Sequence, residues 1–358
     1  MQWINQLGPS EQFALFSAVK VLAVFSVVMF GVAYAVYVER RLCAFIQDRL
    51  GPNRVGPQGL LQPLADAGKA FLKEDFTPGH VRKVYYWLAP ALVMIPSLLT
   101  LAVIPFGSRL GEQKMVIADL NVGVLYTFGI VSLGVYGIVL AGYAANSKYP
   151  FMGGMRSSAQ LISYEVTMGL AVVPVLLWTG DLNLSQIIQA QAGFVSWLPV
   201  LPNWMAFQSP MTFLAFLLFL VAAFAECNRL PFDLPEAEQE LVGGYNTEYS
   251  SIKFALFFMG EYASMIAASA LMTTLFLGGW TLPIFGLDAP AQTLWAGLAQ
   301  IGVFLAKTAA FVIVFIWVRW MLPRFRYDQL MSLGWKRMTP VALANIIVTA
   351  AWLWAAAR

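Results

Sequence analysis

Carboxylates are concentrated in one short stretch of this 358-residue chain, residues 226–249, which reads ECNRLPFDLPEAEQELVGGYNTEY. Six of the chain's 19 Asp and Glu residues lie there, with Arg229 as the one internal base: Glu226, Asp233, Glu236, Glu238, Glu240 and Glu248. Apolar runs flank the stretch, and apolar residues are interleaved with the acids. The plain alternative is a solvated acidic loop, but carboxyl groups held close together and partly buried can share and store protons. The stretch therefore favours a proton-handling site.

Two further carboxylates lie inside long apolar runs. Glu165 ends the segment SAQLISYE, about two turns into one run, and Glu261 lies in FFMGEY, about three turns into another. Each is either a neutralised structural carboxyl or a station of a proton relay, because ionisable groups within a membrane are costly and usually functional. Their position beside the acidic stretch favours the relay. Lys307, inside a third run, has no evident partner, so pairing and function both remain open for it.

Composition places the chain in a membrane. Apolar residues make up 59% of it, charged residues 11%, and the mean hydropathy is +0.68. A soluble domain of this composition would leave a large apolar surface in water. The two cysteines, Cys43 and Cys227, and the one histidine, His80, are too few to ligate an iron–sulfur cluster, a bis-histidine haem or a Cys/His zinc site. No G-x-G-x-x-G fingerprint is found, so we expect no redox cofactor bound by this chain alone.

Eight apolar runs have the length of membrane-spanning helices, about 20 residues each. They fall at residues 12–38, 84–105, 122–145, 159–178, 211–227, 252–278, 292–318 and 339–357. The connections on one face hold 17 of the 22 Lys and Arg residues. By the positive-inside bias this face is cytoplasmic, which places both termini on the periplasmic side.

The chain is expected to form a single polytopic membrane domain over residues 1–358, with long cytoplasmic loops. The first loop, 39–83, contains the segment 59–74, whose apolar residues recur at helical spacing and predict an amphipathic helix at the membrane interface. The second loop, 226–252, is acidic, and the third, 319–338, is basic. The predicted fold class is therefore an all-α integral membrane protein with about eight transmembrane helices and one interfacial amphipathic helix.

Four blocks of sequence resemble, in the right order, the H subunit of respiratory complex I, the NADH-quinone oxidoreductase. They are residues 39–75, 156–165, 226–262 and 319–336, and they extend over essentially the whole chain. The resemblance implies a membrane subunit of a proton-pumping enzyme, which forms much of the quinone-binding chamber and begins an acidic path for protons. One departure is Arg41, where many members of the family have lysine.

The same resemblance implies roles for individual residues. The implied quinone-chamber positions are Arg40, Asp66, Glu226, Arg229, Phe232, Phe258, Arg319 and Arg324. The implied proton-path positions are Asp66, Glu165, Glu226, Glu236, Glu238, Glu240, Glu248 and Glu261. In that family quinone enters from the bilayer between the first span, the interfacial helix and the sixth span.

The resemblance also implies cofactors, partners and location. Quinone is the substrate, while the FMN and iron–sulfur clusters are carried by partner subunits. The expected partners are other membrane-arm subunits, the quinone-proximal subunits of the soluble arm, and membrane lipid, with no nucleic acid. The expected location is a bacterial inner membrane.

Three other functions fit the sequence less well. The nearest is the equivalent subunit of a membrane-bound hydrogenase or of a ferredoxin-linked complex, and the residues around 40–70 weigh against it without excluding it. A stand-alone proton-coupled transporter would be expected to show repeat symmetry, which is not seen. A membrane prenyltransferase needs paired Asp-rich motifs to hold Mg²⁺, whereas the aspartates here are isolated.

Overall fold

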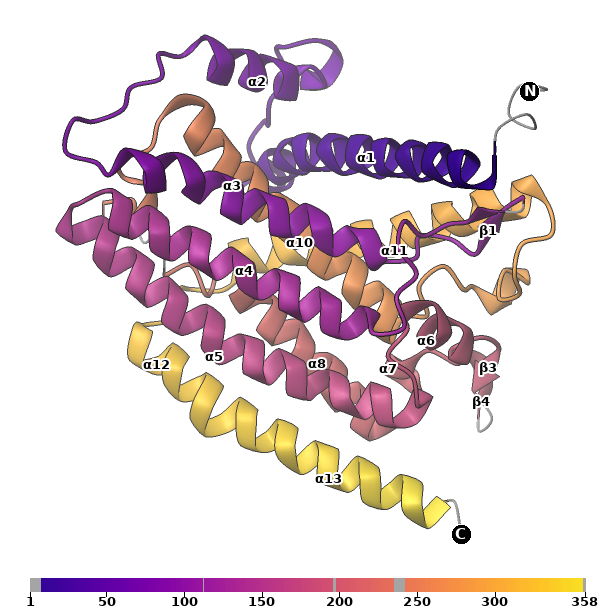
Figure 1. The fold of residues 1–358 in the computed structure, drawn as a ribbon. Coiled ribbons are helices and arrows are strands. Elements are labelled where there is room, and N and C mark those ends of the chain that lie inside the picture. Colours follow the sequence, from indigo (N-terminus) through magenta and orange to yellow (C-terminus); the bar gives the residue numbers. More distant parts are fainter. Residues whose placement is uncertain (1–7, 112, 196–197, 235–241, 357–358) are drawn as a thin grey trace.

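The computed structural model of the protein describes residues 8–111, 113–195, 198–234 and 242–356. Helices make up most of these residues, and the long ones run side by side as a bundle (Figure 1). Both described ends of the chain lie at one end of this bundle, and α2 and α12 lie at the other (Figure 1). The prediction of an all-α integral membrane protein is confirmed.

Seven helices among the described residues are long and apolar enough to cross a membrane. They are α1 (Pro9–Ile46), α3 (Lys83–Thr100), α4 (Gly123–Ala144), α5 (Lys148–Thr179), α10 (Ser251–Phe276), α11 (Leu294–Met321) and α13 (Thr339–Ala356). The remaining predicted span is the 17-residue helix α8 (Pro210–Glu226). It rises about 25 Å, slightly less than the hydrocarbon core of a bilayer. The eight predicted runs thus correspond to seven long helices and a short one.

Helix α5 differs most from its predicted bounds. It begins at Lys148, well before the predicted start at residue 159, and its 32 residues extend about 48 Å. Two bases, a proline and two glycines interrupt the apolar residues of segment 148–158 and concealed this start. An apolar run marks the part of a helix in lipid and not the whole helix. The helix ends at Gly180, whose φ of 72° is the left-handed conformation that commonly closes a helix.

Hydrogen bonds from the backbone to capping side chains explain where α8 and α11 begin. The side chain of Ser209 accepts a hydrogen bond from the backbone N–H of Thr212, and Pro210 occupies the first turn of α8. The side chain of Thr293 accepts a hydrogen bond from the N–H of Ala296 at the start of α11. These oxygens satisfy N–H groups that have no partner within the helix.

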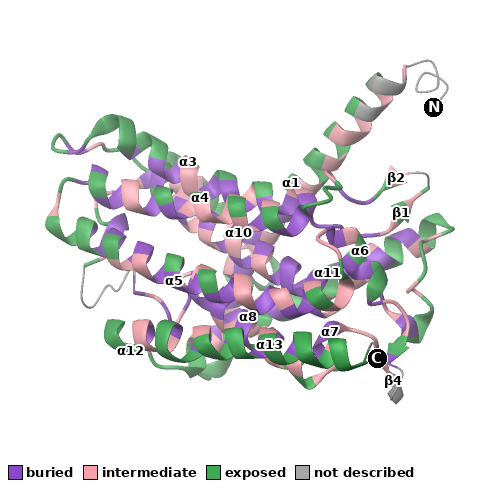
Figure 2. Cartoon of the chain, turned by 60° about the horizontal axis from the view of Figure 1, so that its bottom comes forward, coloured by how far each residue is buried: buried purple, intermediate pink, exposed green. Residues whose placement is uncertain are grey.

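The centre of the bundle is formed by α5, α8 and α10. Phe219, Ala222 and Phe276 are fully buried there, and the rings of Phe219 and Phe276 lie 5.5 Å apart. Buried residues are concentrated in this region, whereas α13 and the outer part of α1 are largely exposed (Figure 2). Large exposed apolar surfaces of this kind are typical of membrane or protein–protein contacts.

Helices α4 and α5 meet backbone to backbone. A Cβ atom on Gly142 would lie 2.6 Å from the carbonyl oxygen of Pro150, closer than any side chain can approach. The contact therefore requires glycine, and it fixes α5, the helix that carries Glu165, against α4.

Short elements close both ends of the bundle. At the end with α2 lie η2 (Pro57–Gly59), α2 (Gln62–Leu72), η4 (Gly244–Asn246), α12 (Tyr327–Ser332) and the π-helical turn η6 (Leu333–Met338). Toward the other end lie η3 (Leu101–Val103), α6 (Leu184–Ala190), α7 (Met205–Gln208), η5 (Pro283–Phe285) and two antiparallel hairpins, β1 (Arg109–Leu110) with β2 (Gln113–Lys114) and β3 (Phe194–Val195) with β4 (Leu198–Pro202). Helix α2 corresponds to the amphipathic helix predicted over 59–74.

Candidate functional site

Four parts of the chain bring charged side chains together near the end of the bundle that carries α2. Glu39 comes from α1, Arg229 from the loop after α8, Glu261 and Tyr262 from α10, and Arg319 from α11. We refer to these five residues as the ionic cluster. One oxygen of Glu39 accepts hydrogen bonds from Arg229 at 3.2 Å and from the Tyr262 hydroxyl at 2.7 Å, and the other accepts one from Arg319. The carboxylate of Glu39 is thus shared by three donors.

Arg229 joins the two carboxylates of the cluster. Its side chain is 3% exposed, and its Nε atom lies 2.9 Å from Oε1 of Glu261 in an ion pair. Its guanidinium also lies 4.1 Å from the ring centre of Tyr262. Burial opposes the charged form of Arg229, but Glu261, Tyr262 and Glu39 outweigh burial and hold its pKa above the ordinary value. With two arginines and two glutamates, the cluster is balanced in charge.

A second ion pair lies beside the cluster. Nη2 of Arg324 donates to Oδ2 of Asp233 at 2.8 Å. Burial raises the pKa of Asp233, while Arg324 pulls it in the opposite direction. A cavity of ≈ 10 Å³ adjoins both Asp233 and the cluster, and it is lined by Asn228, Arg229, Leu230, Asp233, Phe258, Glu261 and Arg319. This volume holds about one water molecule. A quinone ring would fit only if side chains or α2 moved, or if a partner subunit completed the site.

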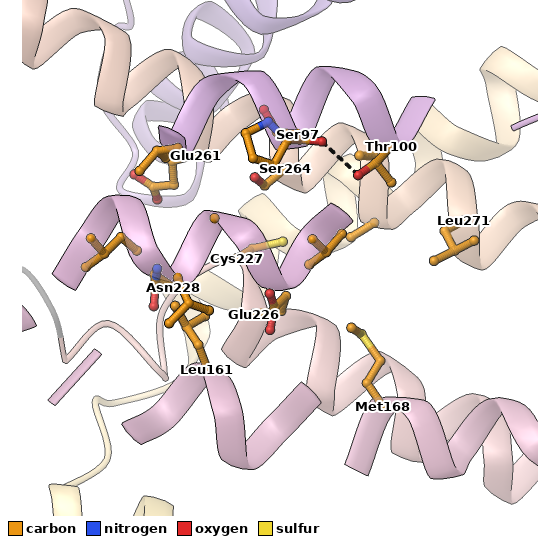
Figure 3. Close-up of a pocket in the computed structure, with 18 of the residues that line it drawn as sticks. Ser97, Thr100, Leu161, Met168, Glu226, Cys227, Asn228, Glu261, Ser264 and Leu271 are labelled. Atoms are coloured by element: carbon orange, nitrogen blue, oxygen red, sulfur yellow. Dashed lines mark hydrogen bonds between the residues drawn. The ribbon is translucent and has the colours of Figure 1, made fainter. Parts of the chain in front are cut away.

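A larger cavity extends from the cluster into the bundle. Its volume is ≈ 80 Å³, enough for several water molecules. Glu261 and Glu226 both line it, together with polar Ser97, Thr100 and Asn228 (Figure 3). The Oε2 atom of Glu226 is buried and has no hydrogen-bond partner among the described residues. A buried carboxyl oxygen that has no partner in the described part of the chain and lies next to a cavity of this size indicates a place for water.

The structure brings several of the predicted chamber residues together. Arg229 and Arg319 belong to the ionic cluster, Arg324 lies next to it, and the ring of Phe258 lies 5.1 Å from that of Tyr262.

The other chamber residues lie further out or are packed away. Arg40 pairs with Asp66 at 2.7 Å and joins α1 to α2. Phe232 is 3% exposed and is packed between the rings of Tyr164 and Phe325, at 5.3 and 5.5 Å. Contact of any of these residues with quinone stays a prediction.

The predicted proton-path residues divide into four sets, of which the first is Asp66 on α2, paired with Arg40. Glu165 on α5 is half-buried and lies within electrostatic range of Glu226, which extends the series Glu261 and Glu226 toward α5. Glu248 lies apart from that series, near the surface, with its Oε2 atom 3.6 Å from Nε2 of His80. The remaining members lie outside the described residues: Glu236, Glu238 and Glu240.

Sequence reasoning missed two members of the ionic cluster. Glu39 is 7% exposed and is the acceptor that joins three elements, yet in sequence it stands at the end of an apolar run beside Arg40 and Arg41. Such a position is typical of interfacial charges. The available signal was an acid placed on the apolar side of two bases, together with a tyrosine, Tyr262, directly after an acid inside a span.

Lys307, which sequence left open, has clear partners. Its ammonium group donates to three backbone carbonyls, those of Leu277 at 2.7 Å, Gly279 at 3.0 Å and Thr281 at 2.7 Å. It also lies 4.0 Å from the ring centre of Trp204. All three N–H donors bond to carbonyls just after the C-terminal end of α10. A positive charge is favourable at that end of a helix, so the lysine stabilises it. This arrangement favours pairing over proton transfer.

Replacing Lys307 with Met is expected to lower the thermal stability of the assembled protein. The change leaves three carbonyls without a donor, at a cost of about 2 kcal/mol or more. The measurement is the unfolding midpoint in detergent. Lys20→Met is the matched control, because Lys20 also lies within a span but has no hydrogen bond or ion pair in the described part of the chain. Unchanged stability with lost proton translocation would instead make Lys307 a functional group.

The sequence is similar over most of its length to proteins of one family. The family model described as NADH dehydrogenase matches residues 19–350. The chain is 51% identical over 334 residues to an H subunit of NADH-quinone oxidoreductase from Geobacter metallireducens, covering 92% of this chain and 94% of that protein. It is 46% identical over 347 residues to an H subunit from Cytophaga hutchinsonii, covering 95% and 97%. It is 50% identical over 333 residues to the H subunit from Rickettsia bellii, covering 92% and 91%. The chain therefore belongs to the NADH dehydrogenase family, with the H subunits of NADH-quinone oxidoreductase.

Proposed function

We propose that this chain forms part of the quinone-binding chamber of a proton-translocating NADH-quinone oxidoreductase and the start of its proton-coupling path. The chain itself is a multi-pass membrane subunit of such an enzyme. The observation that carries the proposal is the ionic cluster, in which Glu39, Arg229 and Glu261 are held in a largely buried, charge-balanced group.

The cluster suits the electrostatics of quinone reduction. Reducing a quinone takes up two electrons and two protons, so negative charge arises on its oxygens before protons arrive. Arg319 is the most exposed cation of the cluster, at 29% of its side chain, and its guanidinium can stabilise that charge. In a medium of low dielectric constant, the new charge also acts strongly on the neighbouring carboxylates. We assign the electron supply, through FMN and iron–sulfur clusters, to partner subunits.

The larger cavity offers a route for the protons. Charge arising at the cluster weakens the hold of Arg229 on Glu261, which then gains affinity for a proton. Water in the ≈ 80 Å³ cavity would connect Glu261 with Glu226, and Glu165 lies beyond. Protons would thus move along buried carboxyls as the charge on quinone changes.

The proposed setting follows from the same residues. The end that carries α2, the ionic cluster and most basic residues would face the cytoplasm, with both termini on the periplasmic side of a bacterial inner membrane. The cluster would then lie where a soluble arm can deliver electrons. Other membrane-arm subunits would cover the exposed apolar faces and continue the proton path.

Photo-crosslinking with a short-chain azido-quinone tests the chamber directly. In the purified complex, label is expected on residues 39–75 or 226–262 of this chain. Free unlabelled quinone should compete with it. Label found only on other subunits, with none on this chain, would reject the chamber. That result would favour a related complex in which the equivalent subunit binds no quinone.

Replacing Glu226 with Gln tests the proton path. The amide keeps the volume but cannot exchange a proton, so proton translocation driven by NADH and quinone is expected to fall about tenfold or more. Reduction of an artificial acceptor such as ferricyanide should persist, because it does not need the membrane path. Glu74→Gln is the control, since Glu74 is an exposed carboxylate at the same end. Equal loss of both activities in Glu226→Gln would indicate failed assembly, and unchanged translocation would remove Glu226 from the path.

A further inference from the structure

Helix α2 is attached to the bundle by a few polar contacts. None of its residues is buried, and Leu64 and Leu72 are 68% and 90% exposed. Toward its N-terminal end, Arg40 of α1 pairs with Asp66 at 2.7 Å, and the hydroxyl of Tyr37 donates to the carbonyl of Gln58 at 2.7 Å. Because the helix buries so little apolar surface, these contacts and those at its other end determine where it lies.

The first residue of α10 caps the C-terminal end of α2. Oγ of Ser251 lies 3.0 Å from the carbonyl oxygen of Ala70 and 2.9 Å from that of Lys73. The last carbonyls of a helix have no partner within it, so a hydroxyl from a distant helix replaces the missing donor. Ser251 has a φ of 53°, a left-handed conformation that is unfavourable for a residue other than glycine. An unfavourable backbone held in place by tertiary contacts is typical of functional positions.

A second contact fastens the segment that follows α2. Nζ of Lys253 donates to both carboxylate oxygens of Asp75, at 2.7 and 2.8 Å, and to Oγ1 of Thr77 at 3.2 Å. The ammonium also lies 3.8 Å from the ring centre of Trp87, and Lys253 is 3% exposed. A buried, paired lysine of this kind holds its partner segment in one position.

Arg40, Ser251 and Lys253 hold α2 in place, and we refer to their contacts as the tethers of α2. These residues lie on α1 and α10, two of the helices that carry the ionic cluster. Ser251 and Lys253 lie on α10, about 15 Å and about 12 Å along the axis from Glu261. Arg40 directly follows Glu39 on α1. The position of α2 is therefore fixed relative to the cluster from both sides.

We propose that Ser251 and the Lys253–Asp75 pair are positioning residues that hold α2 against α10 and so set the passage of a long-chain quinone from the bilayer to the ionic cluster. This inference rests on the proposed function. If the tether loosens, α2 occupies its competent position for a smaller fraction of the time, which raises the apparent KM and leaves kcat nearly unchanged.

Ser251→Gly is the decisive variant, and Ser250→Ala is its control. Glycine removes the hydroxyl and accepts the left-handed backbone without strain. The neighbouring Oγ of Ser250 is buried without a hydrogen-bond partner in the described part of the chain, so its removal should cost nothing. In assembled complex, quantified by NADH–ferricyanide activity, Ser251→Gly should raise the KM for a long-chain quinone about fivefold, and that for a short-chain quinone less. The kcat should remain close to that of Ser250→Ala.

Hydrogen–deuterium exchange of residues 62–72 gives a readout that does not depend on activity. Exchange should be faster in Ser251→Gly than in Ser250→Ala, and Asp75→Asn should act in the same direction through the other tether. If Ser251→Gly does not assemble, Asp75→Asn carries the test. Faster exchange with an unchanged KM would overturn the inference while leaving the proposed function intact, and so would unchanged exchange or a lower kcat at constant KM. Loss of the proposed function itself would appear separately, as absent azido-quinone label.

Discussion

Replacing Glu39 with Gln is expected to remove most of the quinone reductase activity of the assembled complex. The carboxylate of Glu39 is shared by Arg229, Arg319 and Tyr262, and glutamine keeps its volume but not its charge. Two arginines then remain against the single carboxylate of Glu261. Leaving a buried charge uncompensated costs about 3–5 kcal/mol, so the cluster must rearrange or lose its geometry. The measurement is the rate of NADH–quinone reduction, normalised to NADH–ferricyanide activity.

The control for Glu39→Gln removes an ion pair that water already screens. Asp328 pairs with Arg326 at 3.3 Å, and their side chains are 66% and 76% exposed. Asp328→Asn should change quinone reduction very little, since exposed pairs contribute about 0–1 kcal/mol. If Glu39→Gln retained the same rate as this control, the ionic cluster would not be needed for quinone chemistry and the proposed function would lose its main support.

Replacing Arg229 with Met is expected to impair both assembly and quinone reduction. Methionine fills part of the space but leaves the buried Glu261 without its ion-pair partner. Adding Glu261→Gln removes the uncompensated charge, so the double variant should assemble better than Arg229→Met alone. Quinone reduction should stay low in the double variant, because neither the guanidinium nor the exchangeable carboxyl is present. In this pattern the amount of assembled complex reports charge balance, and the rate of quinone reduction reports the chemistry.

The comparison of the two single variants with the double one measures the coupling directly. Residues in a buried ion pair give strongly non-additive effects, whereas the two members of an exposed pair are only weakly coupled. The exposed pair Arg326 and Asp328 supplies the reference cycle, for which near-additive effects are expected. If the amount of assembled complex fell further in the double variant than in either single one, Arg229 and Glu261 would not act as a unit.

Sequence was sufficient for the class of protein, for its spans and for most of the acids near the cavity. Apolar runs of membrane length are a local property, because each helix must satisfy its own backbone hydrogen bonds in lipid. The same reasoning explains the error at α5, since residues 148–158 are helical outside the apolar run. Glu261 and Glu226 were recognisable because an acid beside or within an apolar run is rare and costly.

Only the tertiary structure decided how these groups are paired. Glu39 meets Arg229 across 190 residues and Arg319 across 280, and nothing in the local pattern around any of them encodes the other two. The partners of Lys307 are backbone carbonyls, which carry no side-chain signature in sequence. A sequence shows which charges a membrane segment must accommodate. Which opposite charge or carbonyl compensates each of them depends on helix packing, because compensation acts over a few ångströms in space and not along the chain.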